Sequence, residues 1–227
     1  MSLRAAFDLH VHSAASHDAC DWPEALIAAA RRQGLDGIAI TDHDNRKGFE
    51  YCLKRGLARE DGLPVEGILI IPGEEITTAD GHLLAYGPSP RGLAGKPALE
   101  ACKQVTEAGG VPVPAHPFDA WRQGIRPPRL NVLPISSLEI FNSASSRKTN
   151  QQAAKYASVR SLGRLGGSDA HLASAVGAAR TLLEVEELSV ANVLAALRRG
   201  GEVKGRRLGL IALLRKQSAI LCRRKIE

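Results

Sequence analysis

The chain has 227 residues, 44% of them hydrophobic, which suits one globular domain of the barrel size class or at most two small ones. No run reaches the roughly 18 consecutive apolar residues of a membrane span, and no signal-peptide core precedes Asp8, so we expect a cytoplasmic protein with no membrane contact. The net charge of +6 favours partners that carry phosphate.

Short apolar runs alternate with amphipathic stretches along the chain, which is the pattern of βα units and predicts a parallel sheet, open or closed. Pro23 opens the first helix and Gly34 closes it. In chain order we expect a strand over 4–10, a helix over 24–32, a strand over 37–41, a helix over 47–58, a strand over 67–71 ending near Glu75, a strand over 83–86, a helix over 97–107, a strand over 111–115, a strand over 138–141 leading to Asn142, a helix over 149–158, a short element ending at Gly167, and helices over 190–199 and 208–222.

The C-terminal part of the chain is strongly basic. Between Lys204 and Lys225 there are eight Lys or Arg and no acidic residue. A solvated surface is the ordinary explanation for such a run, and contact with nucleic acid is the functional alternative. The four cysteines lie far apart and form no CxxC pair, so neither a zinc ribbon nor a disulfide framework is indicated.

The histidines carry the clearest functional signal, because six of the seven lie at an edge of a predicted apolar strand. In parallel α/β folds the carboxyl ends of the strands meet on one face, where sites are built. His10 and His12 are two residues apart in a strand, so they point to the same face and can grip one ion together. Two unrelated polar residues at a strand end are the alternative.

Further ionisable residues follow the other predicted strands. Thr41-Asp42-His43-Asp44 comes directly after a buried strand, where charged groups are costly unless they are paired or bound to metal. A turn or cap would also explain Asp42 and Asp44, and Asp42 could orient a histidine. The remaining groups of this kind contain Glu74 and Glu75, His82, His116, and Asp169 with His171.

These residues together predict a metal site. Imidazole with carboxylate suits Zn, Mn or Fe, and the number of ligands exceeds the four that one tetrahedral zinc needs, so we expect two or three divalent ions. Nothing in the sequence resembles a serine triad, a P-loop or a dinucleotide-binding glycine motif.

The ordered motifs resemble those of the PHP (polymerase and histidinol phosphatase) family. The matching segments lie between residues 8 and 171 and read HVHSAASHD, ITDHDN, IPGEEITT, GHLLAYG, PAHPF, LEIFNS and GGSDAH. The resemblance implies an α/β fold, a distorted (β/α)7 TIM-like barrel in one domain, with a metal site that hydrolyses phosphoesters or with a role as an accessory domain of DNA polymerases. We therefore expect a catalytic domain over 1–205 and a basic helix over 206–227 packed on it.

The resemblance also implies a ligand set. His10, His12 and Asp169 would hold one metal, His82 and His116 a second, with Glu75 bridging the two, and His17, His43 and His171 a third. Glu75 is preferred to Glu74, which occupies a place that is usually apolar in the family. Many nucleotidase-type members insert a helical subdomain before the AHPF segment, whereas here only 88–110 lies there, which implies a more open pocket.

The expected activity is that of a metal-dependent phosphoesterase acting on small phosphomonoesters, nucleotides or short oligonucleotides. His171 or Asp44 would give the leaving group its proton, and Arg122 and Arg126 would hold substrate phosphate because a guanidinium matches its geometry. Asn142 and Lys148 are further substrate-binding candidates. The alternatives are a non-catalytic, metal-stabilised domain that binds nucleic acid or a polymerase, and an amidohydrolase, which the absence of a strand-end Lys beside the ligands disfavours. The oligomeric state is left open.

Overall fold

The computed structural model of the protein describes residues 2–209. Apart from Leu208 and Gly209, which are not helical, the predicted helix over 208–222 lies outside the described residues, as does most of the basic segment 206–227. The expected domain boundary stays a prediction. Within residues 2–209, no helix is both long enough and apolar enough to cross a bilayer.

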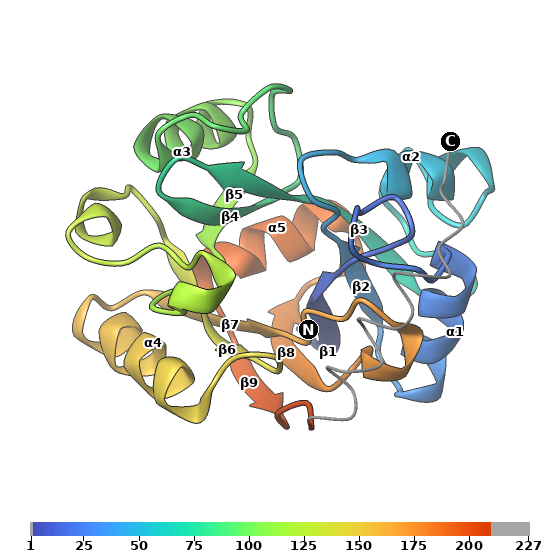
Figure 1. Cartoon of the computed structure of the whole chain (residues 1–227). Coiled ribbons are helices and arrows are strands. Elements are labelled where there is room, and N and C mark those ends of the chain that lie inside the picture. Colours follow the sequence, from blue (N-terminus) through green and yellow to red (C-terminus); the bar gives the residue numbers. More distant parts are fainter. Residues whose placement is uncertain (1, 210–227) are drawn as a thin grey trace.

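The described chain is a mixed α/β fold built on a curled seven-stranded sheet (Figure 1). In spatial order the sheet contains β5 (Val111–Pro114), β4 (Gly81–Tyr86), β3 (Leu69–Thr78), β2 (Gly37–Ile40), β1 (Leu3–Val11), β8 (Ala179–Val185) and β9 (Glu202–Gly205). A separate parallel pair consists of β6 (Ser137–Asn142) and β7 (Gly163–Gly167). Just after β7, the Ala170 carbonyl accepts a hydrogen bond from the His12 backbone N–H at 2.8 Å, so the pair closes against the end of β1.

In the described part of the chain, five helices and the strands enclose three apolar cores. The helices are α1 (Pro23–Arg32), α2 (Lys47–Lys54), α3 (Ala98–Glu107), α4 (Arg147–Val159) and α5 (Val190–Arg199). Alternate residues of the sheet face inward onto α5, which lies inside the curl, while α1 and α2 cover one outer face and α3 and α4 another (Figure 1). This packing leaves the strand ends at one rim free to carry polar side chains.

Local sequence explains most helix boundaries. Ser146 and Ser189 cap α4 and α5, each accepting a backbone N–H three residues later, which satisfies one of the free donors of a helix start. The expected helix over 47–58 is shorter than predicted, because α2 ends at Lys54 and Gly56 takes a positive φ of 68°.

The sheet departs from a regular repeat of parallel strands and helices. Only two residues separate β3 from β4, and such a short connection permits only antiparallel pairing. β4–β5, β1–β8 and β8–β9 are antiparallel as well, and the sequence did not predict β8 or β9. The predicted α/β class is therefore confirmed, with a curled half-barrel sheet, whereas the distorted (β/α)7 barrel stays a prediction.

Candidate metal centre

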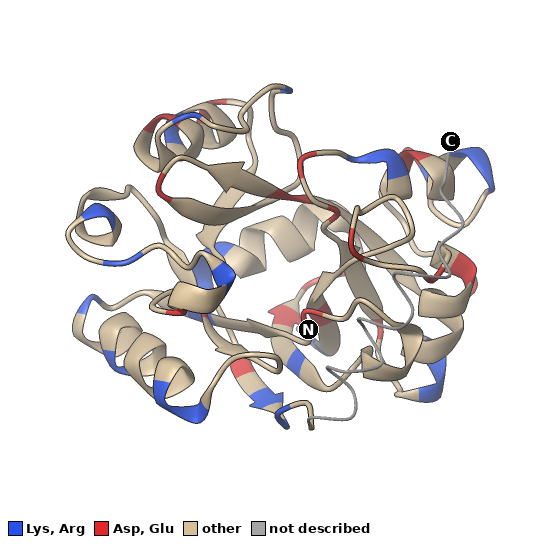
Figure 2. Ribbon diagram, in the orientation of Figure 1, with Lys and Arg blue, Asp and Glu red and all other residues tan. Residues whose placement is uncertain are grey.

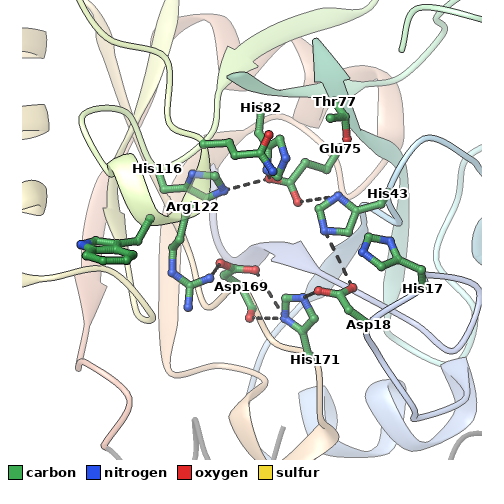
Figure 3. Close-up of a pocket in the computed structure, with 12 residues that line it drawn as sticks. His17, Asp18, His43, Glu75, Thr77, His82, His116, Arg122, Asp169 and His171 are labelled. Atoms are coloured by element: carbon green, nitrogen blue, oxygen red, sulfur yellow. Dashed lines mark hydrogen bonds and ion pairs between the residues drawn. The ribbon is translucent and has the colours of Figure 1, made fainter. Parts of the chain in front are cut away.

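Most of the predicted ligands come from distant parts of the chain and line one cavity of about 490 Å³ (Figure 3), while His10 and His12 are buried next to Glu75. His10 and His12 belong to the end of β1, Glu75 to β3 and Asp169 to the turn after β7. His82 lies near the start of β4, and the antiparallel pairing of β4 with β3 brings this residue to the same rim. The described lining residues are His17, Asp18, His43, Glu75, Thr77, His82, His116, Trp121, Arg122, Gln123, Asp169 and His171.

The Glu75 carboxylate is the centre of the cluster. Five imidazole nitrogens lie 2.9–3.5 Å from its two oxygens: His82 Nδ1 and His116 Nε2 beside Oε1, and His10 Nε2, His12 Nε2 and His43 Nδ1 beside Oε2. Successive residues of a strand face opposite sides, so Glu74 points away and lies 3.6 Å from Arg46 Nε. This geometry favours Glu75 as the shared carboxylate.

Within residues 2–209, four overlapping groups of side chains place their ligand atoms within 4.8 Å of one another, close enough to hold a metal ion. One group coincides with the set expected for the first ion, and another contains Asp18 where the sequence suggested His17. His17 lines the same cavity, with its ring centroid 4.9 Å from that of His43. The groups are His10, His12 and Asp169; His10, Glu75 and His116; His43, Glu75 and His82; and His12, Asp18, His43 and His171.

The buried imidazoles fall into two kinds according to the direction in which their pKa is shifted. It lowers the pKa of His43 to about 3 and also lowers the pKa of His171, so both rings are neutral and can donate a lone pair. Burial opposes the charged form of His10 as well, yet the carboxylates of Glu75, Glu139 and Asp169 hold its pKa well above the usual value. A bound cation would replace such a proton, because metal ligands must be deprotonated.

Two buried imidazole nitrogens without a hydrogen bond also indicate that this cluster can hold a cation. His43 Nδ1 and His171 Nε2 are buried and form no hydrogen bond with any residue in the described part of the chain. His171 Nε2 nevertheless lies 2.7 Å from Asp18 Oδ2. A nitrogen and a carboxylate oxygen that approach each other without the geometry of a hydrogen bond can both aim their lone pairs at one ion.

Two residues behind the cluster fix its orientation. Glu139 accepts a hydrogen bond from His10 Nδ1 at 3.0 Å and one from the His116 backbone N–H at 2.6 Å. Asn142 Nδ2 donates to Glu139 at 3.2 Å and to Asp169 at 3.3 Å. Glu139 was not among the predicted residues, although a Glu inside the buried strand of the LEIFNS segment was a visible signal, and Asn142 is turned toward these carboxylates.

The other candidates differ in their distance from the cluster. Arg122 donates from Nη1 to Asp169 at 2.7 Å, and its side chain, 24% exposed, lines the cavity. Arg126 lines an adjoining cavity of about 480 Å³ instead. Lys148 is exposed on α4, and Asp44 accepts the Thr77 backbone N–H at 2.7 Å without being among the residues that line the cavity.

Comparison with known proteins places this arrangement in a family. The model of the PHP domain matches residues 8–157, and that of the PHP-associated region matches residues 147–201. An uncharacterized protein of Methanocaldococcus jannaschii is 27% identical over 148 residues, which are 60% of this chain and 80% of that protein.

Two solved structures share the fold. A two-domain protein of Bacteroides vulgatus containing a PHP-like metal-dependent phosphoesterase superposes with a TM-score of 0.71 at 22% identity, over 95% of this chain and 69% of that one. The lesion-specific endonuclease Q of Pyrococcus furiosus superposes with a TM-score of 0.68 at 20% identity, over 89% of this chain and 57% of that one. At these identities the likeness shows the fold alone.

Proposed function

The chain belongs to the PHP family, and from that premise we propose that it is a metal-dependent phosphoesterase that hydrolyses phosphate esters with water. The observation that carries the proposal is the Glu75 carboxylate, which two of the candidate metal groups share and which faces a cavity with Arg122 in its wall. A carboxylate shared between two ligand sets is suited to hold two ions close together.

We propose two or three divalent ions, Zn, Mn or Fe. His10, His12 and Asp169 would hold one, and His82 and His116 a second, with Glu75 between them. His43 and His171 would hold a third, together with Asp18 or His17. Such ions would polarise a phosphoryl oxygen and lower the pKa of a coordinated water.

The chain's own residues would orient the reactants. Glu139 fixes the ring of His10, and the Asp169 backbone carbonyl lies 2.9 Å from His171 Nδ1, which directs its Nε2 toward the cluster. Arg122, anchored through one nitrogen to Asp169, would offer the rest of its guanidinium to a phosphate. Of the two candidates for protonating the leaving oxygen, His171 lines the cavity and Asp44 is bonded to the Thr77 backbone.

The test is phosphate release by protein stripped with chelator and reloaded with Mn, Zn or Fe. The panel contains sugar phosphates, mononucleotides, 3′,5′-bisphosphates and short RNA. Glu75→Gln should abolish metal-dependent release, whereas the matched control Glu74→Gln, which changes a neighbour on the opposite side of the strand, should keep it. Silence across the panel with metals shown to be bound would favour the non-catalytic, polymerase- or nucleic-acid-binding alternative. Release that survives Glu75→Gln would refute this centre.

Nucleic acid is the second substrate class to test. Endonuclease Q, which shares the fold, has been solved in complex with a duplex substrate that carries an abasic lesion at the active site. This chain has a net charge of +6, which would attract a polyanion. Because the chain spans 57% of the length of that endonuclease, cleavage of nucleic acid remains a proposal.

A further inference from the structure

We propose that Trp121 is a stacking platform for a nucleobase, so that the esters bound at the metal centre are those of nucleosides. This inference rests on the proposed phosphoesterase function and narrows its substrate class. It goes beyond the metal ligands, because stacking would select the organic part of the substrate.

Trp121 combines exposure with a place in the cavity wall. Its side chain is 99% exposed, and it is the only large hydrophobic residue of high exposure in residues 2–209 that also lines the metal cavity. Trp22, the other tryptophan, is half-buried and packs edge-on against Tyr51 with ring centroids 5.1 Å apart. A single exposed apolar side chain has no meaning by itself, so the attachment of Trp121 matters more.

The segment that carries Trp121 is tied to three of the proposed ligands. The Asp119 backbone N–H donates to the His116 carbonyl at 3.1 Å, and the His82 N–H donates to the Gln123 carbonyl at 2.8 Å. The neighbouring Arg122 is bonded to Asp169. The backbone that carries the indole is therefore held at a fixed place relative to the metal centre.

Two local features keep the turn rigid. Asp119 accepts the Trp121 backbone N–H at 3.2 Å and the Ser145 hydroxyl at 2.8 Å, which caps the short 3-10 helix Ala120–Arg122. Gly124 lies so close to the His116 carbonyl that a Cβ there would be 2.2 Å from its oxygen. An aromatic ring on a backbone that is already ordered loses less entropy on stacking than one on a mobile loop.

The surroundings favour a base linked to phosphate over a purely apolar ligand. The second cavity begins on the other side of the same segment, shares Gln123 with the first and is lined by Arg126 and Arg129. Arg129 lies 3.2 Å from Asp80, whereas the Arg126 guanidinium has no hydrogen bond or ion pair with the described residues. Figure 2 shows several Lys or Arg positions, in blue, along the segment that lines the two cavities. A π-face beside guanidinium groups is the combination that binds nucleotides without reading their sequence.

The kinetic test compares adenosine 5′-monophosphate with ribose 5-phosphate, which lacks the base, on metal-loaded protein. Trp121→Ala should raise KM for the nucleotide about 5-fold to 150-fold, the range found when a stacking aromatic is removed, and leave KM for the sugar phosphate unchanged. Trp121→Phe should restore most of the affinity. Trp22→Phe is the matched control and should change neither constant. Equal effects on both esters, or none, would overturn the proposal.

A fluorescence measurement separates this proposal from the phosphoesterase assignment. In Trp22→Phe protein the indole of Trp121 is the only one left, and adenosine 5′-monophosphate should quench its emission while ribose 5-phosphate should not. Quenching without hydrolysis of any ester would support the platform and refute the phosphoesterase. Hydrolysis without quenching and without preference for the base would refute the platform alone.

Discussion

Asp18 and His17 give a sharp test of the third metal group, because they are neighbours in the chain and only one of them is expected to ligate. Asp18 Oδ2 lies 2.7 Å from His171 Nε2, and Asp18 Oδ1 lies 3.8 Å from His43 Nε2. The Asp18 side chain is 19% exposed, whereas His17 is exposed and its ring centroid lies 4.9 Å from that of His43. We expect the carboxylate to ligate.

The expected loss of metal affinity follows from the ligands that remain after the substitution. Asp18→Asn keeps the shape of the side chain and removes the only negative charge from a group whose other members are His12, His43 and His171. Loss of a residue that merely supports a ligand lowers metal affinity about 10–100-fold, so loss of the anionic ligand should cost at least about 1.4–2.7 kcal/mol. His17→Gln should change affinity by less than about threefold, within the range of surface substitutions.

The assay is metal content by mass spectrometry after dialysis, with chelator competition to obtain each affinity. Asp18→Asn should lose one equivalent of metal and keep the ions at the other groups. His17→Gln should match the unmodified protein. The opposite pattern would show that His17 is the ligand and that the turn positions Asp18 for another role. Circular dichroism of both variants checks that the fold is retained.

Two further predictions follow from buried groups. Glu139→Gln weakens the acceptor that orients His10, and we expect metal affinity to fall about 10–100-fold with the fold unchanged; unaltered metal content would contradict the orienting role. Burial raises the pKa of Cys52 to about 12, against 9.0 for an unperturbed thiol. Because only the thiolate reacts, alkylation at pH 9 should be about 500-fold slower in the native protein than in denatured protein, and equal rates by peptide mapping would contradict its burial.

The sequence predicted the cluster because polar residues at strand ends have few explanations in a buried sheet. His82 joins the cluster for a different reason than expected. It lies near the start, not the carboxyl end, of β4, and the antiparallel pairing of β4 with β3 brings it to the same rim. β3 extends to Thr78, well past the predicted apolar run. Glu75 can be buried in this extension because it contacts histidines from distant parts of the chain, among them His116. Its environment is set by segments far away in the chain.

The residues that sequence reasoning missed depend on the same long-range contacts. Asp18 and His17 are adjacent in a turn, and only the path of that turn decides which of them faces His171. Glu139 lies within a strand, and the local pattern does not show which residue its carboxylate contacts. In the structure it bonds to His10, which is 129 residues away in the sequence. β8 pairs antiparallel with β1 and with β9, and such pairing is not part of a pattern of βα units.

The energetics of the cluster favour a functional reading over a structural one. Glu75 and Asp169 are buried carboxylates, and they are balanced by protons on His10 and His12, whose pKa values they raise, and by the Arg122 guanidinium beside Asp169. A buried ionic network of this kind is often no more stabilising than apolar residues of similar volume. Ions that replaced those protons would link metal binding to the stability of the fold. The same ions would lie beneath a cavity whose wall carries Arg122 and Trp121, where a phosphate ester can reach them.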